Sequence, residues 1–222
     1  MTLTSFRESV RYDDGVVGVS AFILAGGRSS RMGSDKALLP FGDKNLLQLA
    51  LSKAKAVSQE PLIVGERERY SAYGDVIEDR FPGCGPLGGI HAALCATQAD
   101  LNLVLSVDMP LMTSDFLIWL AQRAVAGREL AFVPEVQGRR QPLCAVYRRT
   151  AQCVIEQALK MGDFKIDHVF PLIPTRYIKE EELFGAGFLP DIFRNVNTRD
   201  DYEAVGKARN QASPQFSERQ VL

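Results

Sequence analysis

Short runs of Val, Ile and Leu recur between residues 19 and 136, and stretches compatible with helices lie between them. Several runs are apolar without alternation, which is typical of strands that are covered on both faces. Strands are predicted at Val19–Ala25, Pro61–Gly65, Asp75–Asp79, Leu101–Asp108 and Leu130–Val136, and helices at Asn45–Val57, Leu87–Thr97 and Ser114–Ala126. This alternation predicts a parallel sheet with helices on both sides.

The pattern changes in the segment AFVPEVQGRRQPLCAVYRR, which predicts two strands joined through a turn at 137–139. We expect this hairpin to be a small β-excursion inserted into the α/β order. A helix is predicted over Thr150–Met161 and a last one after Thr198, a candidate N-cap, whereas Pro171–Pro190 is harder to assign. The expected fold class is three-layer, Rossmann-like α/β with a mostly parallel sheet.

The composition is ordinary for a soluble globular protein, with 46% hydrophobic and 24% charged residues among 222. A formal net charge of −1 provides no global attraction to nucleic acid or anionic membranes, so any anion site must be local. No secretory signal and no run of about 18 apolar residues is present. The four cysteines and two histidines form no zinc pattern. We therefore expect a cytoplasmic protein with reduced cysteines.

The stretch AFILAGGRSSRMGSDKALLPFG joins a predicted strand to a glycine pair and clustered positive charge. Ligands of parallel sheets bind beyond the carboxyl ends of the strands, where Gly26 and Gly27 lie. Glycine backbone can approach a phosphate closely, and Arg31 and Lys36 can add charge-assisted hydrogen bonds. Neither GxGxxG nor GxxxxGK[ST] is present, so the stretch is either a phosphate loop of another type or a structural turn with solvated arginines.

A second strand end lies in DRFPGCGPLGGIHAAL, where Asp79 precedes a glycine-rich turn and Gly88-Gly89 opens a predicted helix. Small residues permit close approach of a ligand to the backbone, and the Asp79 carboxylate could accept hydrogen bonds from a base or a ribose. A tight helix start with a solvated carboxylate explains the same residues.

Two further polar motifs follow apolar segments. In VLSVDMPLMTSDF, Asp108 ends the most apolar strand, and Mg²⁺ prefers one or two carboxylates together with substrate phosphates. In FRNVNTRDDY, Asn195 and Asn197 alternate on a predicted short strand, so both amides can face a metal-bound water or a phosphate. A solvated Asp108 and turn or capping chemistry at the asparagines are the alternatives.

These motifs resemble those of the molybdenum cofactor guanylyltransferases, the MobA family of GT-A-like nucleotidyltransferases. The segment LAGGRSSRMGSDKALLPFG satisfies every fixed position of the signature LAGG-x-S-x-RMG-x-DK-x-L, and GPLxGI, Asp-x-Pro and NxNTxxD/EY segments follow. The resemblance covers roughly residues 19–205. We expect an N-terminal extension over 1–18, a nucleotidyltransferase domain over 19–209 and a C-terminal tail over 210–222.

The resemblance implies Mg²⁺-dependent transfer of GMP from GTP to the molybdenum–molybdopterin cofactor, with molybdoenzymes or cofactor-delivery proteins as further partners. It implies neither nucleic-acid nor membrane binding. Arg31, Lys36 and Asp108 are the implied catalytic residues, and Asp108, Asn195 and Asn197 the implied metal site. The implied nucleotide-binding residues are Leu24, Ala25, Gly26, Gly27, Lys36, Asp79, Gly85, Pro86, Leu87 and Asp108.

Other functions remain open. In the family an Asn that helps to hold the guanosine often ends the second strand, where this chain has Gly65. The alternatives are a nucleotidyltransferase that uses CTP or a sugar phosphate, and a non-catalytic nucleotide-binding regulator. The related molybdenum cofactor cytidylyltransferases usually read LAAG, so by resemblance the LAGG and GPLGG segments of this chain favour GTP. A regulator that had lost catalysis would be expected to lose some site residues, whereas this chain keeps Lys36, Asp79, Asp108 and Asn197, which favours an enzyme. Arg139 or Arg140 could meet the acceptor phosphate, although a solvated basic hairpin explains them as well.

Overall fold

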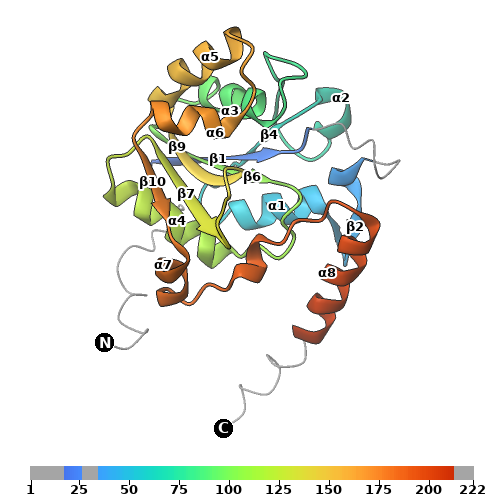
Figure 1. Cartoon of the computed structure of the whole chain (residues 1–222). Helices are drawn as coiled ribbons and strands as arrows, with labels where there is room; N and C mark the ends of the chain where they lie inside the picture. Colours follow the sequence, from blue (N-terminus) through green and yellow to red (C-terminus); the bar gives the residue numbers. More distant parts are fainter. Residues whose placement is uncertain (1–17, 27–34, 213–222) are drawn as a thin grey trace.

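The protein is described here by a computed structural model over residues 18–26 and 35–212, which fold into one large sheet with helices on both faces (Figure 1). The strands are β1 Val19–Leu24, β2 Pro40–Phe41, β3 Lys44–Asn45, β4 Leu62–Val64, β5 Val76–Ile77, β6 Leu101–Ser106, β7 Ala131–Val136, β8 Arg139–Arg140, β9 Cys144–Arg148 and β10 Thr175–Ile178. The α-helices are α1 Leu46–Ala54, α2 Arg67–Tyr70, α3 Pro86–Cys95, α4 Ser114–Ala126, α5 Gln152–Lys160, α6 Ile166–Val169, α7 Glu180–Gly185 and α8 Arg199–Ala212. Short 3₁₀ turns are η2 Lys36–Leu38, η3 Arg149–Ala151, η4 Phe170–Leu172 and η5 Pro190–Phe193.

The large sheet has the strand order β10-β7-β9-β6-β1-β4-β5, and β8 pairs with β7. Strand β1 runs parallel to β4 and β6, β4 parallel to β5, and β7 parallel to β10. Strand β9 is antiparallel to both of its neighbours, and β8 to β7. The mostly parallel sheet with a β-excursion is therefore confirmed, and the carboxyl ends of β5, β4, β1 and β6 lie along one edge.

Alternate side chains of β1 belong to two different hydrophobic layers. Ile23 packs with residues of α1 and α4, whereas Phe22 packs with residues of α3 and α5. Both side chains are fully buried. Because the central strands are covered on both faces, they read as continuous apolar runs, and the three-layer architecture follows.

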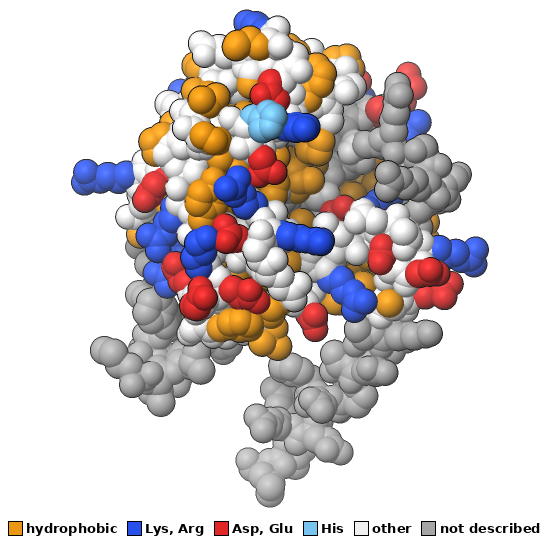
Figure 2. All heavy atoms as spheres, in the orientation of Figure 1, with side chains coloured by type: hydrophobic (Ala, Val, Ile, Leu, Met, Phe, Trp, Pro, Cys, Tyr) orange, Lys and Arg blue, Asp and Glu red, His pale blue; other side chains and the backbone are white. Residues whose placement is uncertain are grey.

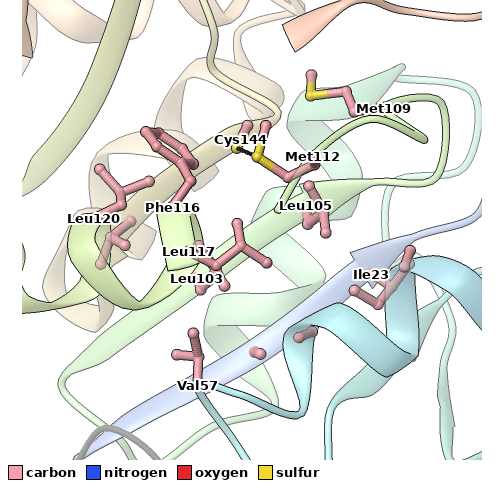
Figure 3. Close-up of a cluster of buried hydrophobic side chains, with 14 of the residues drawn as sticks. Ile23, Val57, Leu103, Leu105, Met109, Met112, Phe116, Leu117, Leu120 and Cys144 are labelled. Carbon is pink, nitrogen blue, oxygen red and sulfur yellow. Dashed lines mark hydrogen bonds between the residues drawn. The ribbon is translucent and has the colours of Figure 1, made fainter. Parts of the chain in front are cut away.

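Figure 3 shows the core on the α1 and α4 side of the sheet. Phe116, Leu117 and Leu120 of α4 lie over β6, and Val57, just beyond α1, lies near β1. The Cys144 thiol approaches the Met112 sulfur at 3.9 Å, beside the loop that follows β6. This packing holds β6 and the loop after it in a fixed position.

All but one of the predicted elements are confirmed, with small shifts at their ends. Helix α4 has the predicted bounds, and Thr113 is its N-cap, because its hydroxyl accepts a hydrogen bond from the Phe116 amide at 3.2 Å. Helix α3 begins at Pro86 rather than at the glycine pair, because Gly85 adopts a positive φ of 66° and proline suits the first helical position. The hairpin contains a third short strand, β8, between its two long ones.

One predicted strand is wrong. Residues 194–197 form no strand, although the Val196 amide donates a hydrogen bond to the Asp108 carbonyl at 2.8 Å. The unassigned stretch 171–190 contributes β10 and α7. Helix α8 begins directly after Thr198, as predicted, and the expected domain boundary at 209 falls within it.

Positive and negative side chains are intermixed over the face in Figure 2, in line with the net charge of −1. Among residues 18–26 and 35–212, no helix is long and apolar enough to cross a membrane.

Candidate nucleotide site

Lys36 joins two segments that are distant in the sequence. Its ammonium group lies 3.1 Å from Asp108 Oδ2 and 2.9 Å from Asn197 Oδ1. The Lys36 and Asp108 side chains are each 16% exposed, so solvent screens this ion pair less than a surface pair. Three residues predicted from separate motifs therefore meet at one point.

The carboxyl ends of β1 and β6 position Asp108. These strands pair along their whole length, and the Val107 amide continues the pairing by donating to the Leu24 carbonyl at 3.3 Å. The following residue, Asp108, is thus held beside the end of β1. Asp108 stays in a loop at this edge of the sheet because α4 begins only at Ser114, after Pro110 and the cap at Thr113.

Asn197 is held by the start of α8. The Asp201 carboxylate accepts hydrogen bonds from the amides of Asn197 and Thr198 at 3.0 and 2.9 Å, and the Asp201 amide donates to Thr198 Oγ1 at 3.1 Å. The hydrogen bonds from the Asn197 amide and from Thr198 lower the pKa of Asp201. The Tyr202 hydroxyl donates to the Pro40 carbonyl, which ties α8 to the β2–β3 hairpin. The motif thus has two roles. Thr198 and Asp201 cap the start of α8, and Asn197 contacts Lys36.

Two buried acceptor oxygens of the predicted metal site lack a partner within the described part of the chain. They are Asp108 Oδ1 and Asn195 Oδ1. The backbone brings the two residues near each other, because the amide of Val196, the residue after Asn195, donates to the Asp108 carbonyl at 2.8 Å. An unsatisfied buried oxygen is costly, and a cation or a water bound to it would remove that cost. A carboxylate with neutral amides suits Mg²⁺, which takes further oxygens from substrate phosphates. No cluster of three or more His, Cys, Asp or Glu side chains suited to a metal occurs among the described residues. The donor set thus fits a magnesium ion that arrives with a phosphate ligand.

The end of β1 offers backbone rather than side chains. Leu24 and Ala25 are each 7% exposed, and the Leu24 side chain packs near Gly89. The amides of Ala25 and Gly26 both donate to the Val64 carbonyl, at 3.0 and 3.3 Å. The amide of Gly26 is therefore not the bare donor that the glycine pair suggests, because the pairing of β1 with β4 continues past the last strand residue. Gly27 and Arg31, the other predicted phosphate contacts, lie outside the described residues.

Asp79 lies at the same edge of the sheet, two residues after β5. Its Oδ1 accepts a hydrogen bond from the Phe81 amide at 2.8 Å. Burial raises the pKa of this carboxyl, while the Phe81 hydrogen bond opposes the shift. A Cβ on Gly88 would lie 2.6 Å from Asp79 Oδ2, so glycine is required for this close approach. The carboxylate is therefore set against the first turn of α3, which Gly85, Pro86 and Leu87 begin.

Sequence reasoning missed Tyr70 and Asp35. The Tyr70 hydroxyl lies 2.8 Å from Asp35 Oδ2 and 3.1 Å from the Ala25 carbonyl. A Cβ on Gly65 would lie 2.8 Å from the Tyr70 ring, which explains the glycine at the end of the second strand of the alternating pattern. The sequence signals were Gly65 itself and Asp35, which is the fixed Asp directly before Lys36 in the signature LAGG-x-S-x-RMG-x-DK-x-L.

Arg140 of the basic hairpin pairs with residues of α6 and β10. This guanidinium lies 3.2 Å from Asp167 Oδ1 and 4.6 Å from the centre of the Tyr177 ring. Arg139 and Arg140 form the exposed strand β8. Arg140 thus has a partner within the protein, Asp167. A contact of Arg139 or Arg140 with the phosphate of the acceptor substrate stays a prediction.

Comparison with known proteins identifies the family. A profile described as "MobA-like NTP transferase domain" matches residues 21–169. The chain belongs to this family. A protein of Pelotomaculum thermopropionicum named "probable molybdenum cofactor guanylyltransferase" is 36% identical, over 81% of this chain and 87% of its own length. A Bacillus subtilis protein of the same name is 32% identical, over 85% and 94%.

Solved structures agree with this assignment. The molybdopterin-guanine dinucleotide biosynthesis protein A of Archaeoglobus fulgidus superimposes with a TM-score of 0.77 at 26% identity, covering 86% of this chain and 99% of that one. A CMP:2-keto-3-deoxy-manno-octonic acid synthetase shares the fold, with a TM-score of 0.66 at 16% identity, over 87% and 99%. This chain is therefore a nucleotidyltransferase with the GT-A-like fold.

Proposed function

We propose that this nucleotidyltransferase transfers GMP from GTP to the molybdenum–molybdopterin cofactor, forming molybdopterin guanine dinucleotide and releasing pyrophosphate. The observation that carries the proposal is the meeting of Lys36, Asp108 and Asn197 beyond the carboxyl ends of β1 and β6. Ligands of open α/β sheets bind at this edge. The names of the relatives supply the base and the acceptor.

The chemistry requires positioning and charge neutralisation. The terminal phosphate of the acceptor attacks the α-phosphorus of GTP in line, and pyrophosphate leaves. A phosphate monoester is already largely ionised at pH 7, since its second pKa is about 6, so no protein general base is needed.

In this proposal each residue of the site has one task. Lys36 donates to triphosphate oxygens and neutralises the departing pyrophosphate, and Arg31 adds a second positive charge. Asp108 would hold Mg²⁺ with Asn195 or Asn197, and the ion would neutralise charge that develops on the phosphates. Asp79 accepts hydrogen bonds from the guanine base. The residues at the end of β1 and the start of α3 line the nucleotide.

CTP is the alternative nucleotide donor, because Gly65 stands where the family often has an Asn that helps to hold guanosine. The Tyr70 ring fills the space that a side chain at position 65 would need, so the guanosine-holding Asn of the family has no counterpart here.

The test incubates the purified chain with Mg²⁺, molybdenum-loaded molybdopterin and GTP, CTP or UTP in turn, and detects the dinucleotide product and pyrophosphate. We expect turnover with GTP and its loss in Asp108→Ala. A preference for CTP or UTP would contradict the guanylyl assignment. Full Mg²⁺-dependent transfer by Asp108→Ala would contradict the metal assignment.

A further inference from the structure

Tyr70, the last residue of α2, is buried although α2 is a short helix with mostly exposed neighbours. The residue is 2% exposed, and its ring lies over Gly65 at the end of β4. A buried phenol needs a partner for its hydroxyl, and here that partner comes from the chain segment that carries Lys36.

The hydroxyl group of Tyr70 meets two oxygens from opposite sides of the stretch 27–34. It lies 3.1 Å from the carbonyl of Ala25, which precedes that stretch, and 2.8 Å from Oδ2 of Asp35, which follows it. A phenol has one proton, and the shorter contact with a charged acceptor is the stronger of the two. Burial, and then the hydrogen bond to Asp35, raise the pKa of Tyr70 far above its ordinary range, so the proton stays on the phenol.

The two carboxylate oxygens of Asp35 have different partners, Tyr70 and the turn η2. While Oδ2 faces the phenol, Oδ1 accepts a hydrogen bond from the Ala37 amide at 3.0 Å and so caps the turn η2. The Asp35 carbonyl also accepts from the Leu38 amide at 3.1 Å. The guanidinium of Arg69 lies 3.7 Å from Oδ2 and is 54% exposed, so it is the weaker partner.

Lys36 is the first residue of the turn that Asp35 caps. This turn sets the backbone position from which the ammonium group reaches Asp108 Oδ2 and Asn197 Oδ1. A continuous series of contacts thus runs from the Tyr70 ring through Asp35 to the ion pair. An error of 1 Å in the position of such a group is enough to cost a large factor in rate.

We infer that Tyr70 is a positioning residue of the nucleotide site, which acts through Asp35 to hold Lys36 in place. It does not touch the substrate in this role. The inference rests on the proposed function in one respect, namely that Lys36 binds the triphosphate.

The test uses Tyr70→Phe, which keeps the ring over Gly65 and removes only the hydroxyl. The matched control is Thr97→Val, which also removes one hydroxyl, from a side chain that is 6% exposed. The Thr97 hydroxyl donates to Ser20 Oγ at 3.3 Å, at the amino end of β1 and so away from the site.

We expect Tyr70→Phe to weaken the binding of Mg²⁺–GTP by about 5- to 30-fold in calorimetry. Hydrogen exchange at the amides of Ala37 and Leu38 should become about tenfold faster. Thr97→Val should change neither quantity more than twofold, although both variants lower the melting temperature. Equal effects of the two variants on nucleotide binding and amide exchange would overturn the inference.

A second variant separates action through Asp35 from a direct effect. Asp35→Ser keeps a capping oxygen for Ala37 but removes the acceptor of Tyr70. In that background Tyr70→Phe should add less than a twofold further loss of affinity. A full additional loss would show that Tyr70 acts by another route and would overturn the inference.

The same experiment keeps the two proposals apart. If the wild-type chain binds CTP in preference to GTP, the guanylyl proposal fails, and the variants are compared with Mg²⁺–CTP. If it binds no nucleotide, the proposed function fails, and the exchange at Ala37 and Leu38 decides the positioning role alone.

Discussion

Lys36 and Asp108 are 72 positions apart in the sequence, yet the ammonium nitrogen of one lies 3.1 Å from a carboxylate oxygen of the other. The second carboxylate oxygen, Asp108 Oδ1, is buried and has no partner among the described residues. The lysine therefore satisfies only one of the two carboxylate oxygens of Asp108. The other oxygen, Oδ1, can accept a second cation. A metal ion at Oδ1 and the Lys36 ammonium group at Oδ2 would still compete for the negative charge of one carboxylate, because the two cations repel each other.

Replacing Lys36 with methionine tests this competition. We expect Lys36→Met to slow nucleotidyl transfer by about 10²- to 10³-fold, because a donor aimed at developing phosphate charge is lost. The affinity for Mn²⁺ without nucleotide, measured by electron paramagnetic resonance, should rise instead, because no ammonium group competes for Asp108. The control is Lys55→Met, at an exposed position beyond α1, which should match the wild type in both assays. Loss of both activity and metal affinity in Lys36→Met would contradict the competition.

Gly65 is predicted to be intolerant of any side chain. In Gly65→Ala the new Cβ would lie 2.8 Å from two Tyr70 ring atoms, so the ring or β4 must shift. We expect a loss of about 1–3 kcal/mol in the free energy of unfolding, measured by denaturant titration.

Gly185 provides the matched glycine control, because a Cβ there would meet nothing within 4 Å. Gly185→Ala should be neutral or stabilise the protein by up to about 1 kcal/mol, since it restricts the unfolded chain. If both glycine variants prove equally stable, the Tyr70 ring does not constrain position 65.

The ionised Asp79 carboxylate is predicted to lower the stability of the fold while it serves ligand recognition. Its pKa is raised by burial, so the ionised form is disfavoured in the folded protein, and ionisation at neutral pH lowers stability. Asp79→Asn should therefore raise the free energy of unfolding at pH 7 by up to about 1 kcal/mol, allowing for solvent screening. This advantage should shrink as the pH falls through the raised pKa towards the ordinary value of 3.8, since the wild-type carboxyl is then protonated as well.

The same substitution should weaken GTP binding by about tenfold or more, because hydrogen bonds to a charged acceptor contribute about 1.5–3 kcal/mol. Calorimetry with GTP and CTP measures both the loss and the change in preference. An Asp79→Asn protein that binds GTP as well as the wild type does would remove Asp79 from base recognition.

A residue of this site could be predicted from the sequence when a local pattern marks it, and not when only contacts with distant segments do. Asp108 and Lys36 were predictable, because a carboxylate after a buried strand and a lysine after a glycine-rich strand end are local patterns. Asn197 was predicted as a site residue but on the wrong element, since the alternation in NVNT reflects helix capping by Asp201 rather than a strand. Local patterns alone do not distinguish these two uses of Asn and Thr.

Tyr70 could not be predicted in the same way. In the sequence ERERYSAY it is one aromatic residue in a charged segment, and its partners Ala25 and Asp35 are 45 and 35 positions away. Strand β10 was equally hidden, because the edge segment Thr175–Ile178 is mostly half-buried or exposed and lacks an apolar run. Contacts between distant segments, rather than propensities, determine both features.

His91 should make stability depend on pH near neutrality. It lies on α3, is 2% exposed, and packs edge-to-face against Phe81 with a centroid distance of 5.0 Å. Burial lowers the pKa of His91 below its ordinary value of 6.5. Glu156 and Asp79 favour the protonated form and oppose this shift, whereas Arg80 and Lys160 reinforce it.

Because the folded pKa lies below the unfolded one, the unfolded chain binds the proton first as the pH falls. The free energy of unfolding should therefore decrease from about pH 7 through 6.5 and down to the folded pKa, by up to about 1.4 kcal/mol per pH unit. His91→Gln, which stays neutral throughout, should flatten this part of the profile in melting experiments between pH 5 and 8. If His91→Gln and the wild type lose stability in parallel over this range, another group titrates and His91 does not set the profile.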